Sequence, residues 1–338
     1  DTDLGWSREV WNQLAEIGIL GLGFDEDAGG QIEIQVVQTE IGRRLAPEPV
    51  VHAALGPGAL IAEVGTAEQR ALLDEVAAGE RLLAFAHAEP GMRGPTPEVT
   101  TTAACEGDSW VLSGRKNPVL AGDCADTLVV SAALPDGGIG LFLVDATAAQ
   151  RQPYRTFDGQ RGAQIDFDKV PAEPLGEAVS GEQASAAIGH TLVRISSALC
   201  AEALGAMEEA LRLTSEYLTQ RKQFGVTLSK FQTLTQRAAD MYVSLELARS
   251  MALYAAMSVA DGDLDPTIAA RAKLQIGRSG RHISQEAIQL HGGIGVTDEY
   301  PIGHYAARLT AIEYTLGSSQ DQLHVLIGQL GDYEVVTI

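Results

Sequence analysis

Residues 217–232 read Tyr-Leu-Thr-Gln-Arg-Lys-Gln-Phe-Gly-Val-Thr-Leu-Ser-Lys-Phe-Gln and interrupt a long region of helical apolar periodicity. Arg221 and Lys222 place two positive charges beside an aromatic residue, Phe224, and a glycine, Gly225. Such a group at a helix end suits a ligand that carries phosphate, because cationic side chains bind phosphate oxygens through charge-assisted hydrogen bonds. The alternative is a solvated helix end whose cations complement the helix dipole. These residues alone leave both interpretations open.

The length and the charge of the chain restrict its class. The 338 residues, of which 45% are apolar, suffice for two or three packed regions of a globular protein. The formal net charge of -21 argues against nucleic acid binding, which needs a basic surface. No apolar run approaches the roughly 20 residues that a membrane span requires. The chain begins at Asp1 without an initiator methionine, so we expect a short N-terminal piece to precede it.

The three cysteines, Cys105, Cys124 and Cys200, show no metal-ligand spacing and would leave one thiol over if two of them paired. We therefore expect reduced thiols, a cytoplasmic protein and no metal site. None of the three lies beside a histidine or in a basic motif, which favours a structural role over a catalytic one.

Three regions of different pattern follow one another along the chain. Residues 1–83 and 178–338 show helical apolar spacing, whereas residues 84–177 contain short apolar or β-branched runs between Gly, Pro and Asp. The pair Gly137-Gly138 predicts a hairpin between two of these runs. Asp265-Pro266 predicts the start of a helix, with an N-cap followed by a proline. The order predicts an α+β multidomain chain in which a small β domain separates two helical domains.

Two phrases in the last region, together with this order, resemble the acyl-CoA dehydrogenase family. The first is Arg-Lys-Gln-Phe-Gly at residues 221–225 with Phe-Gln at 231–232, and the second is Gln-Leu-His-Gly-Gly-Ile-Gly at residues 289–295. Either phrase alone is weak evidence, but the combination is specific. The resemblance covers essentially the whole chain except the family's first helix. It implies an N-terminal helical domain at 1–83, a β-barrel or sandwich domain at 84–177, and a C-terminal four-helix bundle at 178–338 that shares FAD and makes oligomer contacts.

Members of the family bind FAD at a subunit interface and dehydrogenate an acyl-CoA thioester between its α and β carbons. A glutamate takes the α-proton while a hydride leaves the β carbon for the flavin. One subunit holds the flavin ring through its β domain, and its neighbour contributes the two phrases to the ADP portion. On this chain the resemblance implies one side chain that binds the pyrophosphate and one aromatic ring that packs beside the adenosine. It also implies two amide-bearing side chains and a glycine pair that lets the backbone approach the cofactor closely. These residues are Arg221, Phe224, Gln232, Gln289, Gly292 and Gly293.

The β-domain half of the family pattern is altered in this sequence. The family's Thr-Glu-Pro-Gly-x-Gly-Ser phrase, whose hydroxyls bind flavin or substrate, reads Ala-Glu-Pro-Gly-Met-Arg-Gly at residues 88–94. The family's Trp-Ile-Thr triplet beside the flavin ring is replaced by Pro118-Val119-Leu120. The side chains that would hold a flavin ring are therefore missing from this half.

The base position is altered as well. The family's base is usually the Glu of a Tyr-Glu-Gly-Thr phrase, and here residues 315–318 read Thr-Leu-Gly-Ser, which places Leu316 at that position. Leucine cannot accept a proton. Some members carry the base on the first helix of the bundle, where this chain has Arg194 and no acid. Glu202 and Glu313 are weak alternatives, because acids on helices more often serve as exposed or paired charges.

The missing residues all belong to the ring-binding and proton-abstracting half of the site. We therefore predict the base-lacking small subunit of an α2β2 FAD-dependent acyl-CoA dehydrogenase, similar to those acting on pimeloyl-CoA and on steroid side chains. The predicted partners are a homologous subunit that carries the catalytic Glu, an acyl-CoA substrate and an electron-transfer flavoprotein as electron acceptor. Two alternatives stay open: a self-sufficient acyl-CoA dehydrogenase with Glu202 or Glu313 as a relocated base, and a scaffold homologue that binds no flavin.

Overall fold

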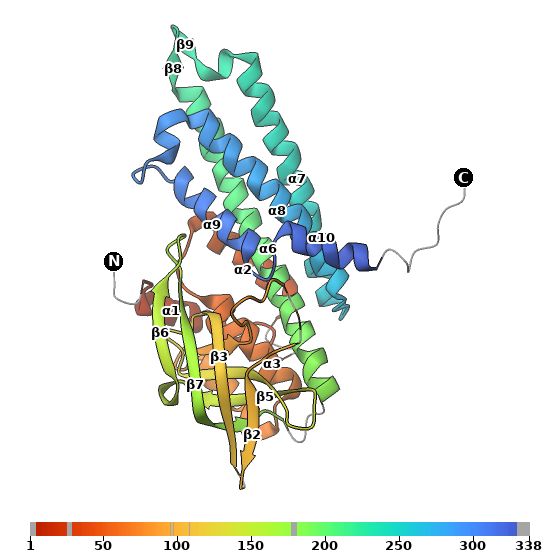
Figure 1. Cartoon of the computed structure of the whole chain (residues 1–338). Coiled ribbons are helices and arrows are strands. Elements are labelled where there is room, and N and C mark those ends of the chain that lie inside the picture. The colour runs from red at the N-terminus through yellow and green to blue at the C-terminus, as the bar shows by residue number, and fades with distance from the viewer. Residues whose placement is uncertain are drawn as a thin grey trace, which may run out of the picture. The chain divides into compact units, whose positions relative to one another are not determined.

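The computed structural model describes residues 5–25, 29–94, 96, 98–107, 109–176 and 181–329. The chain forms two compact units. The first unit comprises Asp1–Ile34 and Pro47–Ile195, and the second comprises Gln35–Ala46 and Ser196–Ile338. The predicted boundary between residues 177 and 178 lies outside the described residues. Figure 1 shows the chain and labels its helices and strands where there is room.

The first region of the chain is helical, as predicted. Its helices are α1 (Arg8–Glu16), α2 (Gln31–Arg44), α3 (Gly56–Val64), α4 (Ala67–Arg70) and α5 (Leu72–Ala77), with a 3-10 turn at Ile19–Gly21 and a π-helical turn at Val51–Leu55. Side-chain hydrogen bonds cap the N-termini of two of these helices, α1 and α4. Ser7 accepts a hydrogen bond from the Val10 amide, and Thr66 and Gln69 form a reciprocal capping box.

The middle region is a β-barrel within the first unit. Its strands are β1 (Leu83–Ala86), β2 (Thr102–Glu106), β3 (Ser109–Leu120), β4 (Thr127–Ala133), β5 (Ile139–Asp145), β6 (Gln150–Arg155) and β7 (Arg161–Pro174). The strand order is β1-β4-β2-β3-β7-β5, and the additional pairing of β4 with β5 closes the path into a barrel. Alternate residues point inward to a core that includes Leu112, Leu128, Phe142 and Ile165. The predicted hairpin at Gly137-Gly138 is confirmed, because β4 and β5 pair antiparallel on either side of it.

The last region returns to helices. It contains α6 (Gly181–Gln220), β8 (Lys222–Gln223), β9 (Val226–Thr227), α7 (Gln232–Ala260), α8 (Pro266–His291), α9 (Ile302–Tyr314) and α10 (Ser319–Gly328), with 3-10 turns at Leu228–Lys230 and Gly292–Val296. In the second unit α8 packs against α7, α9 and α10 (Figure 1). Asp265 caps α8 as predicted, since its Oδ1 accepts a 2.8 Å hydrogen bond from the Thr267 amide. The described elements thus confirm the predicted fold class.

Two glycines let α2 and α6 approach backbone to backbone in the second unit. A Cβ at Gly42 would lie 1.9 Å from the Glu202 carbonyl oxygen, and a Cβ at Gly205 would lie 1.8 Å from the Thr39 carbonyl oxygen. Both distances are far below van der Waals contact, so neither position accepts a side chain without moving a helix. Tyr305 on α9 further fixes this end of α2 by donating a 2.6 Å hydrogen bond to the Arg43 carbonyl.

Within the described residues, no helix combines the length and the apolar character needed to cross a membrane.

Candidate functional site

The cationic group at Arg221 lies on a hairpin, which differs from the expected plain helix end. Helix α6 ends at Gln220, and the Arg221 amide still donates to the Tyr217 carbonyl at 2.8 Å. Strands β8 and β9 then pair antiparallel, with Lys222 opposite Thr227. The two turn residues, Phe224 and Gly225, have φ of 53° and 82°. A two-residue turn with both φ positive matches the twist of a hairpin, and it presents the Arg221 and Lys222 side chains to solvent.

The exposure of the Phe224 ring to water is unfavourable, and contact with another molecule would remove that cost. Its side chain is 91% exposed, and its backbone adopts a positive φ that a bulky residue rarely takes. Phe231, just before α7, meets the Phe224 ring edge-on at 6.1 Å between centroids. Gln232, which begins α7, is exposed beside Phe231. The hairpin therefore presents an aromatic ring, cations and an amide together on one surface.

The end of α8 carries the second predicted group, and it also lies open. Gln289 is exposed in the last turn of the helix. Gly292 has φ 68° and ψ -144°, a backbone conformation available essentially to glycine alone. A Cβ at Gly292 or Gly293 would meet no atom within 4 Å. Packing among the described residues therefore does not explain why position 293 is a glycine. A glycine there would allow a ligand to approach the backbone closely.

An aromatic cluster joins the two groups within the second unit. The His291 ring lies 4.5 Å from the Tyr217 ring and 4.9 Å from the Tyr300 ring, between centroids. Tyr217 precedes the hairpin by one helical turn, and His291 precedes the glycine pair directly. The structure thus brings the Arg221 and Gly292 segments together, although they are about 70 residues apart along the chain (from the SEQ numbering).

Glu202 is buried and fully engaged. It accepts hydrogen bonds on both carboxylate oxygens from Arg308, at 2.5 Å from Nε and 2.8 Å from Nη2. The carboxylate is 6% exposed and the guanidinium 10% exposed, so the pair forms a desolvated, bidentate ion pair. The observed contacts assign Glu202 a packing role between α6 and α9.

Glu313 is likewise held by structural partners. Its carboxylate accepts hydrogen bonds from the amide and the hydroxyl of Ser319, at 2.9 and 3.0 Å, and thereby caps the start of α10. The side chain is buried against Gly277, where a Cβ would lie 1.7 Å from the Glu313 Oε2. Such a carboxylate has little freedom to reach a substrate carbon.

Leu316 lies in the tightly held turn between α9 and α10. Its φ is 60°, and its carbonyl accepts a 2.8 Å hydrogen bond from Gln322 Nε2. The buried Lys273 donates to the carbonyls of Ile312 at 2.5 Å and Thr315 at 2.8 Å. Burial lowers the pKa of Lys273. The backbone of the turn is thus fixed from both sides, while the side chain at its centre is aliphatic.

The β domain contains a buried polar network that the sequence analysis missed. Lys116 is fully buried and donates to Glu89 at 2.9 Å, to Ser131 Oγ at 3.2 Å and to the His87 carbonyl at 3.1 Å. Glu89 also accepts from the amides of Thr100 and Thr101. The residues around Lys116 read Gly-Arg-Lys-Asn-Pro at 114–118, a polar stretch that does not indicate a buried lysine, so its partners are identified only by the structure.

Charge and hydrogen bonding leave no free base in this network. Burial acts to raise the pKa of Glu89, but the hydrogen bonds from Lys116, Thr100 and Thr101 outweigh it and hold that pKa well below its usual range. Burial, and then the positive charge of Lys116, lower the pKa of His87 to about 4. His87 Nε2 donates to the Thr96 carbonyl at 2.8 Å, so Nδ1 accepts from the Ser131 hydroxyl. The network fixes the segment that follows β1 and supplies no group for proton transfer.

The Pro118–Leu120 segment, which was expected to replace the family's flavin-stacking triplet, also serves packing. Val119 is fully buried in the barrel core, and the Asn117–Pro118 peptide bond is cis. Asn117 accepts a 2.9 Å hydrogen bond from the Tyr154 hydroxyl. These side chains form the barrel wall and offer neither an indole nor a hydroxyl to a flavin ring.

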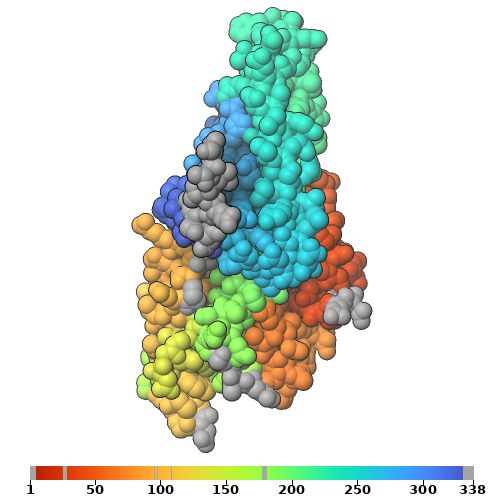
Figure 2. All heavy atoms as spheres, turned by 90° about the vertical axis from the view of Figure 1, so that its right-hand side faces the viewer, coloured from red at the N-terminus to blue at the C-terminus, as the bar shows by residue number. Residues whose placement is uncertain are grey.

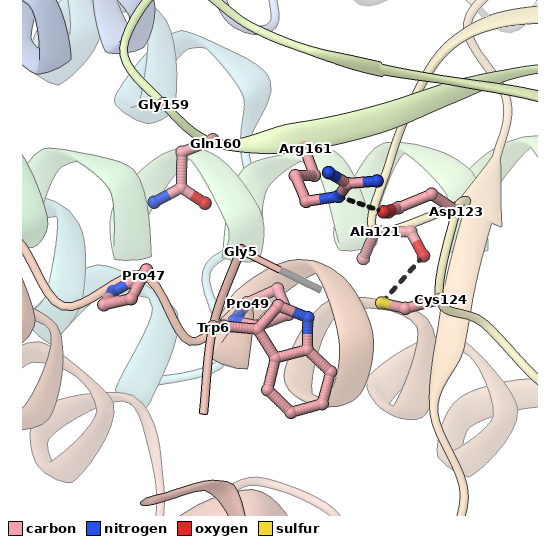
Figure 3. A pocket seen from close by; sticks show the side chains of 10 residues that line it. All are labelled: Gly5, Trp6, Pro47, Pro49, Ala121, Asp123, Cys124, Gly159, Gln160 and Arg161. Carbon is pink, nitrogen blue, oxygen red and sulfur yellow. Dashed lines mark hydrogen bonds and ion pairs between the residues drawn. The ribbon is translucent and has the colours of Figure 1, made fainter. Parts of the chain in front are cut away.

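A small cavity lies near the start of the described chain, in the first unit (Figure 3). Trp6, Asp123, Cys124 and Arg161 are among its lining residues, and Arg161 donates to Asp123 at 2.5 Å. Its volume of about 10 Å³ corresponds to about one water molecule, which is too small for an acyl chain. Burial raises the pKa of the Cys124 thiol, so this cysteine is not an activated nucleophile.

The described part of the chain contains no group of three or more His, Cys, Asp and Glu side chains that could hold a metal ion. The three cysteines are free thiols.

Comparison with known proteins gives a consistent result. Residues 188–330 match the family model of the acyl-CoA dehydrogenase C-terminal domain, and residues 1–80 match that of the N-terminal domain. The human mitochondrial short-chain specific acyl-CoA dehydrogenase is 31% identical, over 94% of this chain and 81% of the relative.

Two solved structures are also similar in fold. A Tcur3481-Tcur3483 steroid ACAD variant is 35% identical with a TM-score of 0.88, over 98% of this chain and 90% of that one. A protein named as an FAD-dependent dehydrogenase is 27% identical with a TM-score of 0.88, over 97% of this chain and 94% of that one.

Proposed function

Given that the chain belongs to the acyl-CoA dehydrogenase family, we propose that it is the subunit without the catalytic base in a mixed assembly with a homologous chain. The observation that carries the proposal is the turn at Leu316. Its backbone is held by Lys273 and Gln322. The side chain predicted from the sequence to occupy the position of the family's glutamate is the aliphatic Leu316. The two acids weighed as substitutes, Glu202 and Glu313, are both engaged in packing contacts.

The cofactor is FAD, which accepts the hydride when bound. This chain would contribute the residues that bind the ADP portion of FAD. The Arg221 guanidinium would donate hydrogen bonds to the diphosphate, and the exposed Phe224 ring would cover the adenosine. Gln232 and Gln289 would add amide contacts, and Gly292 and Gly293 would expose backbone to the same ligand. The open space at the two glycines and the uncovered Phe224 support this fit.

The flavin ring would lie against the partner. In this chain the residues expected beside the ring are Ala88, Gly94 and the Pro118–Leu120 segment, which offer no hydroxyl and no stacking indole. Glu89 and Lys116 nearby are saturated by internal hydrogen bonds. Proton abstraction and carbonyl polarisation would therefore occur in the partner's half of the site.

The surface of α7 supports assembly with another chain. Figure 2 shows this helix at the molecular surface, coloured teal. Large apolar side chains lie exposed along it, namely Tyr242, Val243, Leu247, Leu253, Tyr254 and Met257. Contiguous exposed apolar surface commonly marks a protein interface. The name of the steroid ACAD relative also pairs two proteins.

The remaining partners follow from the family. An acyl-CoA thioester would be the substrate, an electron-transfer flavoprotein the electron acceptor, and the cytoplasm the location. The relative named a steroid ACAD makes CoA thioesters of steroid side chains the first compounds to assay, with dicarboxyl-CoA and straight-chain acyl-CoA thioesters beside them.

Co-expression tests the proposal. The chain is produced alone and together with a homologue from the same organism that carries the Tyr-Glu-Gly-Thr phrase, and each preparation is assayed for bound flavin and for acyl-CoA-dependent dye reduction. We expect flavin and activity only in the mixed preparation. Bound flavin with dehydrogenation by the chain alone would support a relocated base, and a colourless complex with every such homologue would support a scaffold.

A further inference from the structure

We propose that His291 is a positioning residue that locks the Arg221 hairpin and the Gly292-Gly293 turn to each other, so that both segments meet one dinucleotide at once. The inference rests on the proposed function, because it concerns how this chain presents its half of the FAD site. It assigns to a buried histidine a role that involves neither proton transfer nor direct contact with the reacting atoms.

The geometry of the rings carries the first step. The His291 ring is tilted by 31° to Tyr217 at 4.5 Å and by 50° to Tyr300 at 4.9 Å, and the two tyrosines meet edge-on at 6.3 Å. Tyr217 belongs to the last turn of α6, and its carbonyl accepts the Arg221 amide. A shift of the Tyr217 ring would therefore shift the start of the hairpin.

The second step concerns the turn after α8. His291 is the residue from which the 3-10 turn Gly292–Val296 begins. That turn folds back on it, since a Cβ at Gly295 would lie 3.1 Å from the His291 Cβ. A displaced His291 would therefore move the start of this turn, because Gly292 follows it directly in the chain.

The third step explains why a histidine serves here. The ring is buried, and its Nδ1–H donates a 2.7 Å hydrogen bond to the Ala287 carbonyl, which fixes the ring plane. Nε2 is buried without a hydrogen-bond partner among the described residues. A phenylalanine would fill the same space without an unsatisfied nitrogen, so stability alone does not favour histidine. The oriented Nδ1–H bond is what phenylalanine would lack.

The test uses the mixed assembly of this chain with its base-carrying homologue. His291→Ala, His291→Phe, Tyr217→Ala and the His291/Tyr217 double-alanine variant are compared in FAD affinity, by flavin fluorescence after dilution, and in melting temperature. We expect His291→Ala to weaken FAD binding about tenfold, which corresponds to about 1.4 kcal/mol. His291→Phe should recover only part of that loss, because the stacked ring remains but the Nδ1–H bond that fixes its plane is absent. The double variant should be no weaker than the single ones, because both remove the same coupling.

Tyr305→Ala is the matched control, since it removes another buried ring of the second unit that lies outside this cluster. It should lower the melting temperature and leave FAD affinity unchanged. If His291→Ala lowers FAD affinity no more than Tyr305→Ala at an equal loss of melting temperature, His291 has only a structural role and the inference fails. If Arg221→Ala also leaves FAD affinity unchanged, the proposed function itself fails, which separates the two results.

Discussion

At the scale of single residues, Leu316 holds a backbone conformation with φ of 60° in a turn that Lys273 and Gln322 fix from both sides. The fixed backbone means that a side chain at this position has a defined direction. On the proposed assignment, leucine in place of the family's glutamate is therefore a local change of chemistry in a turn whose backbone is otherwise held in place.

Replacing Leu316 by glutamate tests whether a catalytic carboxylate is the only group that this chain lacks for dehydrogenase activity. We expect Leu316→Glu, in the chain alone, to show no acyl-CoA-dependent dye reduction, because one carboxylate does not restore the flavin contacts missing at Ala88, Gly94 and Pro118. Leu316→Gln is the control, because glutamine has nearly the shape of glutamate but carries no negative charge. Activity in Leu316→Glu that Leu316→Gln and the wild type lack would mean that the chain has a complete flavin site of its own.

A second residue-scale prediction concerns His87 and acid. The folded pKa of His87 is about 4, below its ordinary value of 6.5, so between these values the unfolded chain binds a proton that the folded chain does not. Stability must therefore fall as the pH drops from about 6.5 to about 4, by about 3 kcal/mol for the full shift. Urea unfolding at a series of pH values should show this slope, and His87→Gln should remove the His87 share of it. An equal slope in both proteins would contradict the assignment.

At the scale of elements, much of the fold could be predicted from the sequence because the patterns are local. The β-branched runs became β2 to β5, and Asp265-Pro266 began α8, since alternation and capping act over a few residues. The hairpin at β8 and β9 was not predicted. Its turn, Phe224-Gly225, lacks the usual Asn-Gly signal, and its strands are two residues each.

The site was predictable only in part, because sequence patterns act over a few residues and do not identify distant partners. The phrases at Arg221 and Gln289 are local, whereas the links between side chains are made by tertiary packing. Lys116 reaches Glu89 across 27 residues, and Arg308 reaches Glu202 across 106. No spacing rule in a single sequence identifies such partners.

The contact between α2 and α6 gives a prediction for elements. Gly42→Ala would place a methyl group 1.9 Å from the Glu202 carbonyl oxygen, so we expect a loss of about 3 kcal/mol in unfolding free energy. Gly189→Ala on α6 is the control: its added Cβ meets no atom within 4 Å, so it should stabilise the helix by about 0.5–1 kcal/mol. Chemical unfolding of both variants measures the difference. Similar effects from both substitutions would contradict the close approach of the two helices.

At the scale of the whole molecule, the positive charge of the Arg221 hairpin contrasts with the net charge of -21. An acidic chain repels an anionic dinucleotide in general, so a dinucleotide site on it would need local positive charge, which Arg221 and Lys222 supply in the proposed site. The exposed Phe224, the open glycine pair and the exposed apolar side chains of α7 are the features expected of a surface that binds another molecule, and they support the proposed function. On the proposed function, this chain therefore supplies half of a site.

The flavin content of the mixed assembly with Arg221→Ala in this chain tests that claim most directly. A charge-assisted bond to phosphate contributes about 1.5–3 kcal/mol, so the variant complex should bind FAD about 10- to 100-fold more weakly than the wild type, with assembly and melting behaviour of the apoprotein retained. Lys169→Ala, which removes an exposed lysine paired with Glu106 on the barrel, is the charge-matched control and should leave FAD affinity unchanged. Full flavin occupancy in the Arg221→Ala complex under the same dilution would contradict the account.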